Sequence, residues 1–216
     1  MNMNVLLQSL PYLAKGAVQT LWMAILAIAI GSLLGVVLGL AAGSRSKLVR
    51  GSIDTFIFVT RGIPVLVLMF ITYYAFPAVG YRVSSFTAVT VALTLYAAAF
   101  YTDVMRGALA AVPRGQLEAA RSLGIARLPT VFHILLPQAM KSSIPPWLNT
   151  SIVMVKSTSY AAIVGAWELT YAAKEIVERT LATFEIFGAV MAVYFIICYP
   201  MSLLSRRLEK RAAVVH

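Results

Sequence analysis

Residues 118–140 read EAARSLGIARLPTVFHILLPQAM, which divides into two short helical pieces on either side of a break. The first piece opens on Glu118 and two alanines, which favour a helix. Gly124 can end that helix in the left-handed conformation, where we expect a side chain to obstruct the turn. Pro129 suits the first turn of the second piece, and Pro137 ends or kinks it.

The same stretch has an apolar side with charges scattered around it. A helical pair of this kind can dock into a groove on a soluble partner, although an ordinary loop lying on the membrane surface has similar features. The apolar side consists of Leu123, Ile125, Val131, Phe132, Ile134 and Leu135.

The rest of the chain is too apolar for a soluble domain. Hydrophobic residues make up 60% of its 216 residues, charged residues 12%, and the mean hydropathy is +0.84, whereas soluble domains carry about 25% charged residues. The single cysteine, Cys198, excludes a disulfide framework and a cysteine-based zinc site. Catalytic and metal-binding residue patterns are not apparent, and we expect an integral membrane protein.

The apolar residues collect in five runs, each long enough for a helix of about 20 residues across a bilayer. We therefore expect an all-α membrane protein with about five transmembrane helices in a single domain, residues 1–216. The polar stretch 112–143 separates the third and fourth runs. The runs cover about residues 17–42, 53–79, 86–111, 144–167 and 186–204.

Two runs carry further local signals. In the first, Gly31, Gly35 and Gly39 recur at every fourth residue, a pattern that lets another helix approach closely. In the second, Pro64 disfavours helix at Ile63 and breaks the run. Arg61, beside that break, either reaches the cytoplasmic interface or lies in a polar cavity.

Basic residues indicate the orientation, because cytoplasmic loops carry an excess of Lys and Arg. With the N-terminus outside and the C-terminus in the cytoplasm, 12 basic residues fall inside and 4 outside, with Arg61 and Lys156 set aside. The net charge of +10 follows this placement and forms no separate basic face, which argues against nucleic acid as a partner. The inner set is Arg45, Lys47, Arg50, Arg106, Arg114, Arg121, Arg127, Lys141, Arg206, Arg207, Lys210 and Arg211, and the outer set is Lys15, Arg82, Lys174 and Arg179.

Three other classes of membrane protein are alternatives to the features described so far. An intramembrane enzyme would need Asp103, His133 and Glu168 to converge, but they fall at different depths. An ion-coupled transporter needs an intramembrane carboxylate, and Asp103 is expected to pair with Arg106 on the same helix. A membrane scaffold subunit is the third alternative.

The stretch around residue 118 resembles the EAA loop of ABC importer permeases. Glu118, Ala119 and Ala120 are followed after three residues by Gly124, and after nine more by Ile134-x-Leu-Pro137. Residues 61–64 (RGIP), 111–118 (AVPRGQLE), Pro145-Pro146 and 156–159 (KSTS) also resemble the permeases for polar amino acids such as histidine and glutamine. The resemblance covers about residues 12–211.

The resemblance implies a type I importer in a bacterial cytoplasmic (inner) membrane. A second permease subunit, identical or paralogous, would complete the channel, two cytoplasmic ATPase subunits would bind ATP and Mg, and an extracytoplasmic solute-binding protein would deliver the solute. No phosphate-binding G-x-x-x-x-G-K-[ST] sequence occurs in this chain, so hydrolysis belongs to a partner and the chain is not an enzyme. The residues implied in coupling are Glu118, Ala119, Ala120, Gly124, Ile134 and Pro137.

The resemblance also places a substrate pathway along the third and fourth runs. Tyr96 and Phe100 stand in a stretch where many members carry an Asn, and Ser157 replaces an Asp of those members. These departures disfavour a cationic amino acid and leave an ectoine-like solute or an opine open. The pathway residues implied are Tyr96, Phe100, Lys156, Ser157, Thr158 and Ser159.

Overall fold

The computed structural model describes residues 3–213, and within them the chain is helical throughout, apart from short connections. The long apolar runs form long helices because a lipid-facing backbone must satisfy its hydrogen bonds internally. In order, the elements are α1 Met3–Ala41, α2 Lys47–Gly62, α3 Val65–Ala78, α4 Ser85–Ala110, α5 Arg114–Ser122, α6 Arg127–Pro129, the π-helical turn η1 Thr130–Leu135, α7 Leu136–Ser157, the 3₁₀ turn η2 Thr158–Val164, α8 Leu169–Thr180 and α9 Thr183–Ala213.

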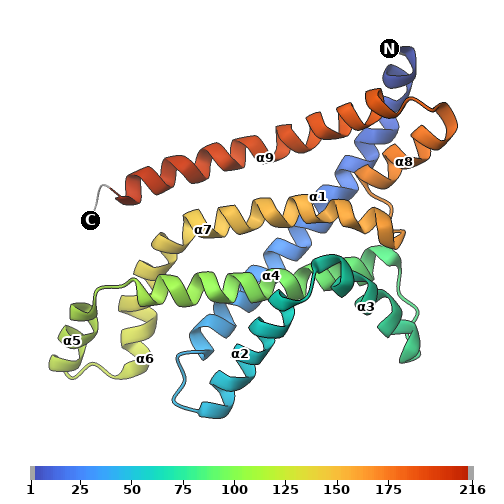
Figure 1. Ribbon diagram of the computed structural model, residues 1–216. Helices are drawn as coiled ribbons and strands as arrows, with labels where there is room; N and C mark the ends of the chain where they lie inside the picture. The colour runs from blue at the N-terminus through green and yellow to red at the C-terminus, as the bar shows by residue number, and fades with distance from the viewer. Residues whose placement is uncertain (1–2, 214–216) are drawn as a thin grey trace.

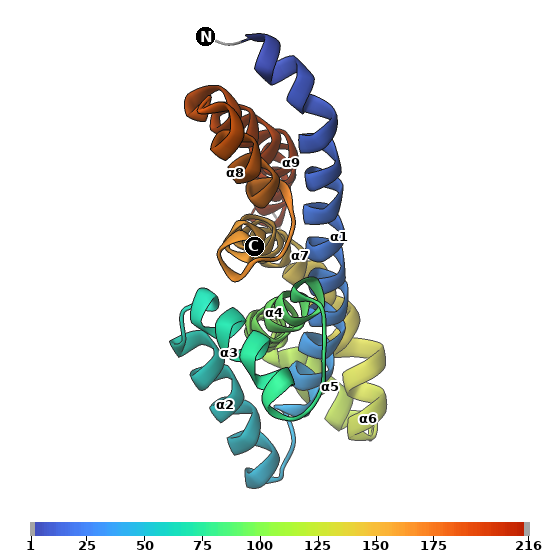
Figure 2. The same cartoon turned by 90° about the vertical axis from the view of Figure 1, so that its right-hand side faces the viewer.

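Helices α4, α7 and α9 lie side by side, and α1 crosses them obliquely (Figure 1). The view along this layer shows α1 on one side and the bent pair α2–α3 beyond α4 (Figure 2). At the left end of Figure 1 lie α5, α6 and the C-terminal part of α9, whereas α8 and the start of α1 lie at the right. The loop 112–143 therefore shares one end of the molecule with the end of α9.

The glycine repeat of α1 packs against α4. A Cβ at Gly31 would stand 2.7 Å from Cβ of Ala97, and one at Gly39 would stand 2.7 Å from Cβ of Met105. At Gly35 the added atom would collide with Tyr101. These distances are too short for any side chain, so the predicted close helix approach is confirmed and its partner is α4 of the same chain.

Length and composition support three or four membrane crossings among the described residues, compared with the five expected. Residues 4–41, 85–110 and 183–210 qualify alone, and α2 with α3 would add a fourth, although the pair is bent by 106°. The fourth apolar run is divided between α7 and η2, and Pro145, Pro146 and Asn149 lower the hydropathy of α7. The argument that α7 is the fifth crossing is its place between α4 and α9, which both qualify as spans (Figure 1).

The element boundaries differ from the apolar runs mostly at the ends of the chain. The third run coincides with α4 to within one residue, and the second is broken at Ile63 and Pro64 as expected. By contrast, α1 starts at Met3 and includes Pro11, and α9 continues to Ala213. The charged turns at the end of α9 carry no apolar signal, whereas the start of α1 falls within the candidate span 4–41.

Candidate functional site: the loop and the outer face of α4

The first piece of the loop is α5, and Gly124 ends it as predicted. Gly124 has φ +70°, its N–H donates to Arg121 O at 3.0 Å, and the Ile125 N–H donates to Ala120 O at 3.0 Å. This pair of bonds is the Schellman closure, which satisfies carbonyls that the helix end leaves free. No atom lies within 4 Å of a Cβ built at Gly124. The expected obstruction is therefore wrong, and the positive φ alone is what favours glycine here.

The second piece begins at α6 and continues without interruption through η1 into α7. Pro129 lies in the first turn, where its missing N–H costs no hydrogen bond. The helix bends between α6 and α7 (Figure 1), where the π turn precedes Pro137. A π turn and a proline are both recognised causes of helix kinks. The helix does not end at Pro137, and the bend between α6 and α7 agrees with the other predicted effect, a kink.

The loop turns one side inward and exposes the other. Ala120 is buried, and Ile134 is half-buried. Glu118 and Ala119 are exposed, and the described residues contain no ion pair to Glu118. Leu123 is 77% and Leu128 69% exposed, and both lie outside the candidate membrane spans. The loop thus presents apolar side chains and one unpaired carboxylate at its surface.

A second group of side chains follows the outer face of α4. The Tyr96 and Phe100 rings lie 4.9 Å apart, and the Arg61 guanidinium carbon stands 4.7 Å from the Phe100 ring centre. Arg61 also forms an ion pair with Asp103, one turn further along α4. A hollow of about 440 Å³ adjoins Arg61, Phe100 and Asp103, and Ser142 and Pro146 line it on the α7 side. The group combines an aromatic surface with both signs of charge.

The ion pairs of this region differ from the expected one. Asp103 pairs with Arg61 across two helices, and Arg106 pairs with Asp54 of α2 at 2.7 Å. The expected pairing of Asp103 with Arg106 is therefore wrong. Residues three apart on a helix can pair, but here the break after Arg61 brings α2 against α4 and supplies each residue with a partner on the other helix.

The segment Lys156–Ser159 lies at the junction of α7 and η2. Each of its three hydroxyls donates to its own helix: Ser157 to Val153 O, Thr158 to Val155 O and Ser159 to Lys156 O, at 2.7–2.9 Å. Thr158 is fully buried, whereas Lys156 is exposed. Among the described residues, no hydrogen bond, ion pair or ring contact joins this segment to Tyr96 or Phe100.

Sequence reasoning missed a buried carboxylate at the start of α8. Glu168 has no exposed surface and accepts hydrogen bonds from Tyr171 N (2.9 Å), Thr20 Oγ1 (3.1 Å) and Tyr194 Oη (3.2 Å). Burial raises the pKa of the Glu168 carboxyl, and these hydrogen bonds lower it by less. The helix-capping position, three residues before Tyr171, is the signal in the sequence.

Comparisons with known proteins agree along the whole chain. The model of the family described as "Binding-protein-dependent transport system inner membrane component" matches residues 35–214. The probable amino-acid ABC transporter permease protein YckA of Bacillus subtilis is 32% identical over 98% of this chain and 94% of its own length. The glutamine transport system permease protein GlnP of Escherichia coli is 32% identical over 96% of this chain and 95% of its own length.

Two solved structures resemble the fold. An amino acid ABC transporter crystallised with histidines has a TM-score of 0.90 and 31% identity, and the match covers 98% of this chain and 99% of the other. The methionine transporter MetNI has a TM-score of 0.77 at 23% identity, with 94% and 96% covered, and shows the fold alone. The predicted type I importer permease fold is confirmed. This chain belongs to the family of binding-protein-dependent transport system inner membrane components, as a permease subunit of an ABC importer.

Proposed function

We propose that the importer carries polar amino acids and that residues 118–137 of this subunit transmit the motion of the ATPase subunits to the membrane helices. The observation that carries the coupling role is the shape of the loop. A Schellman turn and a kinked helix present exposed Leu123 and Leu128 beside an unpaired Glu118. An amphipathic helical pair of this kind fits a groove on a soluble partner.

The connection of the loop to the rest of the chain supports transmission of force. Through η1, the second piece continues into α7 without a flexible linker. Arg127 donates to the carbonyl of Gly43, which ties the loop to the end of α1. Any displacement of α6 by a partner would therefore move α7 and the end of α1 together.

Charge reversal at Glu118 tests the coupling role. In the complex with its ATPase and receptor, Glu118→Lys is expected to insert normally and to uncouple ATP hydrolysis from uptake. Glu178→Lys, which reverses an exposed acidic residue of α8, is the matched control and should leave uptake unchanged. Normal uptake by Glu118→Lys in a complete complex would show that the coupling assignment is wrong.

We propose further that the solute passes along the outer face of α4, between this subunit and a second permease subunit. Tyr96 and Phe100 offer an aromatic surface there, and Arg61 and Asp103 offer both charges to a zwitterion. Ser157, Thr158 and Ser159 would join this path, with Lys156 close to it. In the present conformation their hydroxyls are occupied by their own helix, so their part would require a rearrangement at the α7–η2 junction.

Cysteine labelling tests this path in a Cys198→Ala background. A water-soluble thiol reagent should label Tyr96→Cys and Ser157→Cys to extents that change with nucleotide state. Ala97→Cys, which is fully buried against α1, should remain unlabelled. If uptake persists while neither position is ever labelled, the pathway lies elsewhere.

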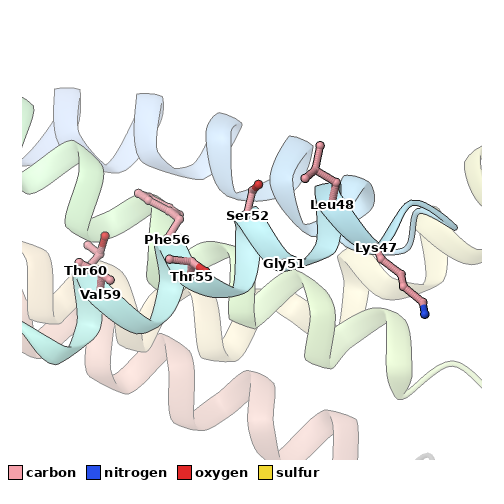
Figure 3. A pocket seen from close by; sticks show the side chains of 8 residues that line it. All are labelled: Lys47, Leu48, Gly51, Ser52, Thr55, Phe56, Val59 and Thr60. Carbon is pink, nitrogen blue, oxygen red and sulfur yellow. The ribbon is translucent and has the colours of Figure 1, made fainter.

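The face of α2 offers one place for the second permease subunit. Eight residues of this helix line an open hollow of about 870 Å³ (Figure 3). They include the small residues Gly51 and Ser52, which permit close helix packing in a membrane, and Phe58 on the same helix is 81% exposed. We propose two permease subunits, two ATPase subunits and one solute-binding protein in the complex.

The membrane orientation is also a proposal, with the N-terminus outside and the C-terminus in the cytoplasm. The placement of α5–α6 at the same end as the C-terminal part of α9 supports it (Figure 1), as does the excess of basic residues there. His216 itself lies outside the described residues. A reporter fused after His216 should behave as cytoplasmic and one inserted near Leu181 as periplasmic, and the reverse pattern would contradict this orientation.

Two other classes of solute fit the same pathway. An opine or an ectoine-like compound would use the same pathway, and the departures at Tyr96 and Ser157 favour such uncharged or zwitterionic solutes over cationic ones. An ion-coupled mechanism would need a free intramembrane carboxylate, whereas Asp103 is engaged by Arg61. An uptake panel with the matched receptor separates these solutes.

A further inference from the structure

A groove of about 990 Å³ lies between the loop and the ends of α1 and α4. Leu40 and Leu109 supply part of its apolar lining from the two long helices. The loop side adds Leu117, Ile125, Leu128, Val131, Phe132 and Leu135. Segments from four parts of the chain thus line one groove, which shares Leu128 and the Arg127–Gly43 contact with the proposed coupling surface.

Four arginines also line this groove: Arg45, Arg50, Arg121 and Arg127. All four are exposed, and no acidic residue is among the lining residues. Arg127 donates to the Gly43 carbonyl. For Arg45, Arg50 and Arg121, the described residues provide no ion pair or side-chain hydrogen bond. The groove therefore carries several unneutralised positive charges above an apolar lining.

The ends of two candidate spans place the groove at the level expected for lipid headgroups. Leu40 is one residue before the end of the span 4–41, and Leu109 is one residue before the end of the span 85–110. Both span ends lie at the end of the molecule that carries the excess of basic residues, which is the cytoplasmic side under the positive-inside rule. The cytoplasmic leaflet contains anionic lipids, and basic pockets between transmembrane helices bind their headgroups.

We propose that this groove binds one anionic phospholipid, such as phosphatidylglycerol, from the cytoplasmic leaflet. Guanidinium groups bind phosphate oxygens in pairs of parallel hydrogen bonds, and the leucine and valine side chains accommodate the start of the acyl chains. A free phosphate ion would leave the apolar lining unused. An acidic protein segment would place polar backbone against the same lining.

Such a lipid would join the loop to the region between α1 and α2, because each of these two segments supplies two of the four arginines of the groove. Arg121 and Arg127 belong to the loop, and Arg45 and Arg50 precede or begin α2. This inference rests on the membrane location of the chain and not on the proposed solute or coupling role.

Native mass spectrometry of the full-length chain in a neutral detergent tests the site with dioleoyl-phosphatidylglycerol as the probe. The double variant Arg45→Gln/Arg121→Gln is expected to weaken binding of the tightest lipid by roughly 25-fold, since each arginine near an anionic surface contributes about a fivefold effect. The control Arg206→Gln/Arg207→Gln removes the same charge from exposed positions on α9 and should change binding by less than about twofold. Arg45→Lys/Arg121→Lys keeps the charge but loses the paired hydrogen bonds, so its affinity should fall between that of the wild type and that of the glutamine variant.

Four results would overturn the proposal. The first is that both glutamine variants lose the same affinity for the lipid, and the second is that the wild type retains dioleoyl-phosphatidylcholine as well as it retains dioleoyl-phosphatidylglycerol. The third is that millimolar inorganic phosphate displaces the lipid, and the fourth is that the complete permease–ATPase complex contains no such lipid. The last would mean that the ATPase covers the arginines. Thermal unfolding of each variant without added lipid distinguishes a lost site from a misfolded chain.

Discussion

Gly124 closes α5 with a positive φ, and the space around it is open. We therefore predict that Gly124→Ala strains the turn by about 1–2 kcal/mol, whereas Gly124→Asn, which tolerates this conformation, costs less. If the turn transmits force, coupled uptake should fall in the order Gly, Asn, Ala. Gly115→Ala, in the same helix and also uncrowded, should leave uptake at the wild-type level. Equal uptake by all three Gly124 forms would remove the turn from the mechanism.

Glu168 has a raised pKa because it is buried. The folded chain therefore holds this proton more tightly than the unfolded chain, whose carboxyl has its ordinary pKa of 4.5. The resulting contribution to the free energy of unfolding is complete below that pH and declines as pH rises through the folded pKa. We predict that the midpoint of thermal unfolding of the wild type, minus that of Glu168→Gln, falls as pH rises from 4 to 8.

Glu178→Gln is the control for this pH series, because its carboxylate is exposed. It removes an exposed carboxylate and leaves Glu168 in place, so the pH trend of the Glu168→Gln difference is compared with it. A Glu168 difference that grows with rising pH would mean that the hydrogen bonds from Thr20 and Tyr194 favour the carboxylate more than burial disfavours it.

The sequence predicts the conformation of some single residues but not the partners or the burial of others. The conformation of Gly124 follows from its place after a helix-forming segment. The partner of Asp103 does not, because four charged residues lie within reach of α2 and α4 and only the angle between these helices selects the pairs. In the sequence, Glu168 is a single charged residue at the end of an apolar run. Its burial depends on contacts with α1 and α9, which are distant in sequence.

At the scale of elements, the contact between α1 and α4 is the tightest feature of the fold. We predict that Gly35→Ala lowers the stability of the purified chain by about 1–3 kcal/mol, the usual cost of overpacking, because its Cβ would collide with Tyr101. Gly188→Ala in α9 meets no atom within 4 Å and should be neutral or slightly stabilising. Thermal unfolding in detergent measures both, and equal midpoints would contradict the packing.

Helices with strong local signals were predictable from the sequence. The glycine repeat indicated a close helix neighbour, and Pro64 indicated the break in the second run. The sequence could not indicate which helix meets the glycines, nor that the break bends the chain by 106°. The fourth apolar run predicts a crossing. The prolines and the lysine in this run lower the mean hydropathy of α7, so α7 does not qualify as a span by itself.

At the scale of the whole molecule, one continuous helical stretch connects the second piece of the loop to the α7–η2 junction. Residues 127–157 run from α6 through η1 and α7 to the segment proposed for the pathway. The loop and the outer face of α4 are proposed to contact other chains, the ATPase and the second permease subunit. The family pattern at residues 118–137 supplied this part of the function, which packing within the chain alone would not indicate.

Uptake into proteoliposomes that contain this subunit with its ATPase, in the presence of the solute-binding protein, tests the central claim most directly. We predict that accumulation of a polar amino acid requires hydrolysable ATP on the side of the loop, and that Glu118→Lys abolishes accumulation while ATP hydrolysis continues. Accumulation driven by a proton or sodium gradient without ATP would contradict the account.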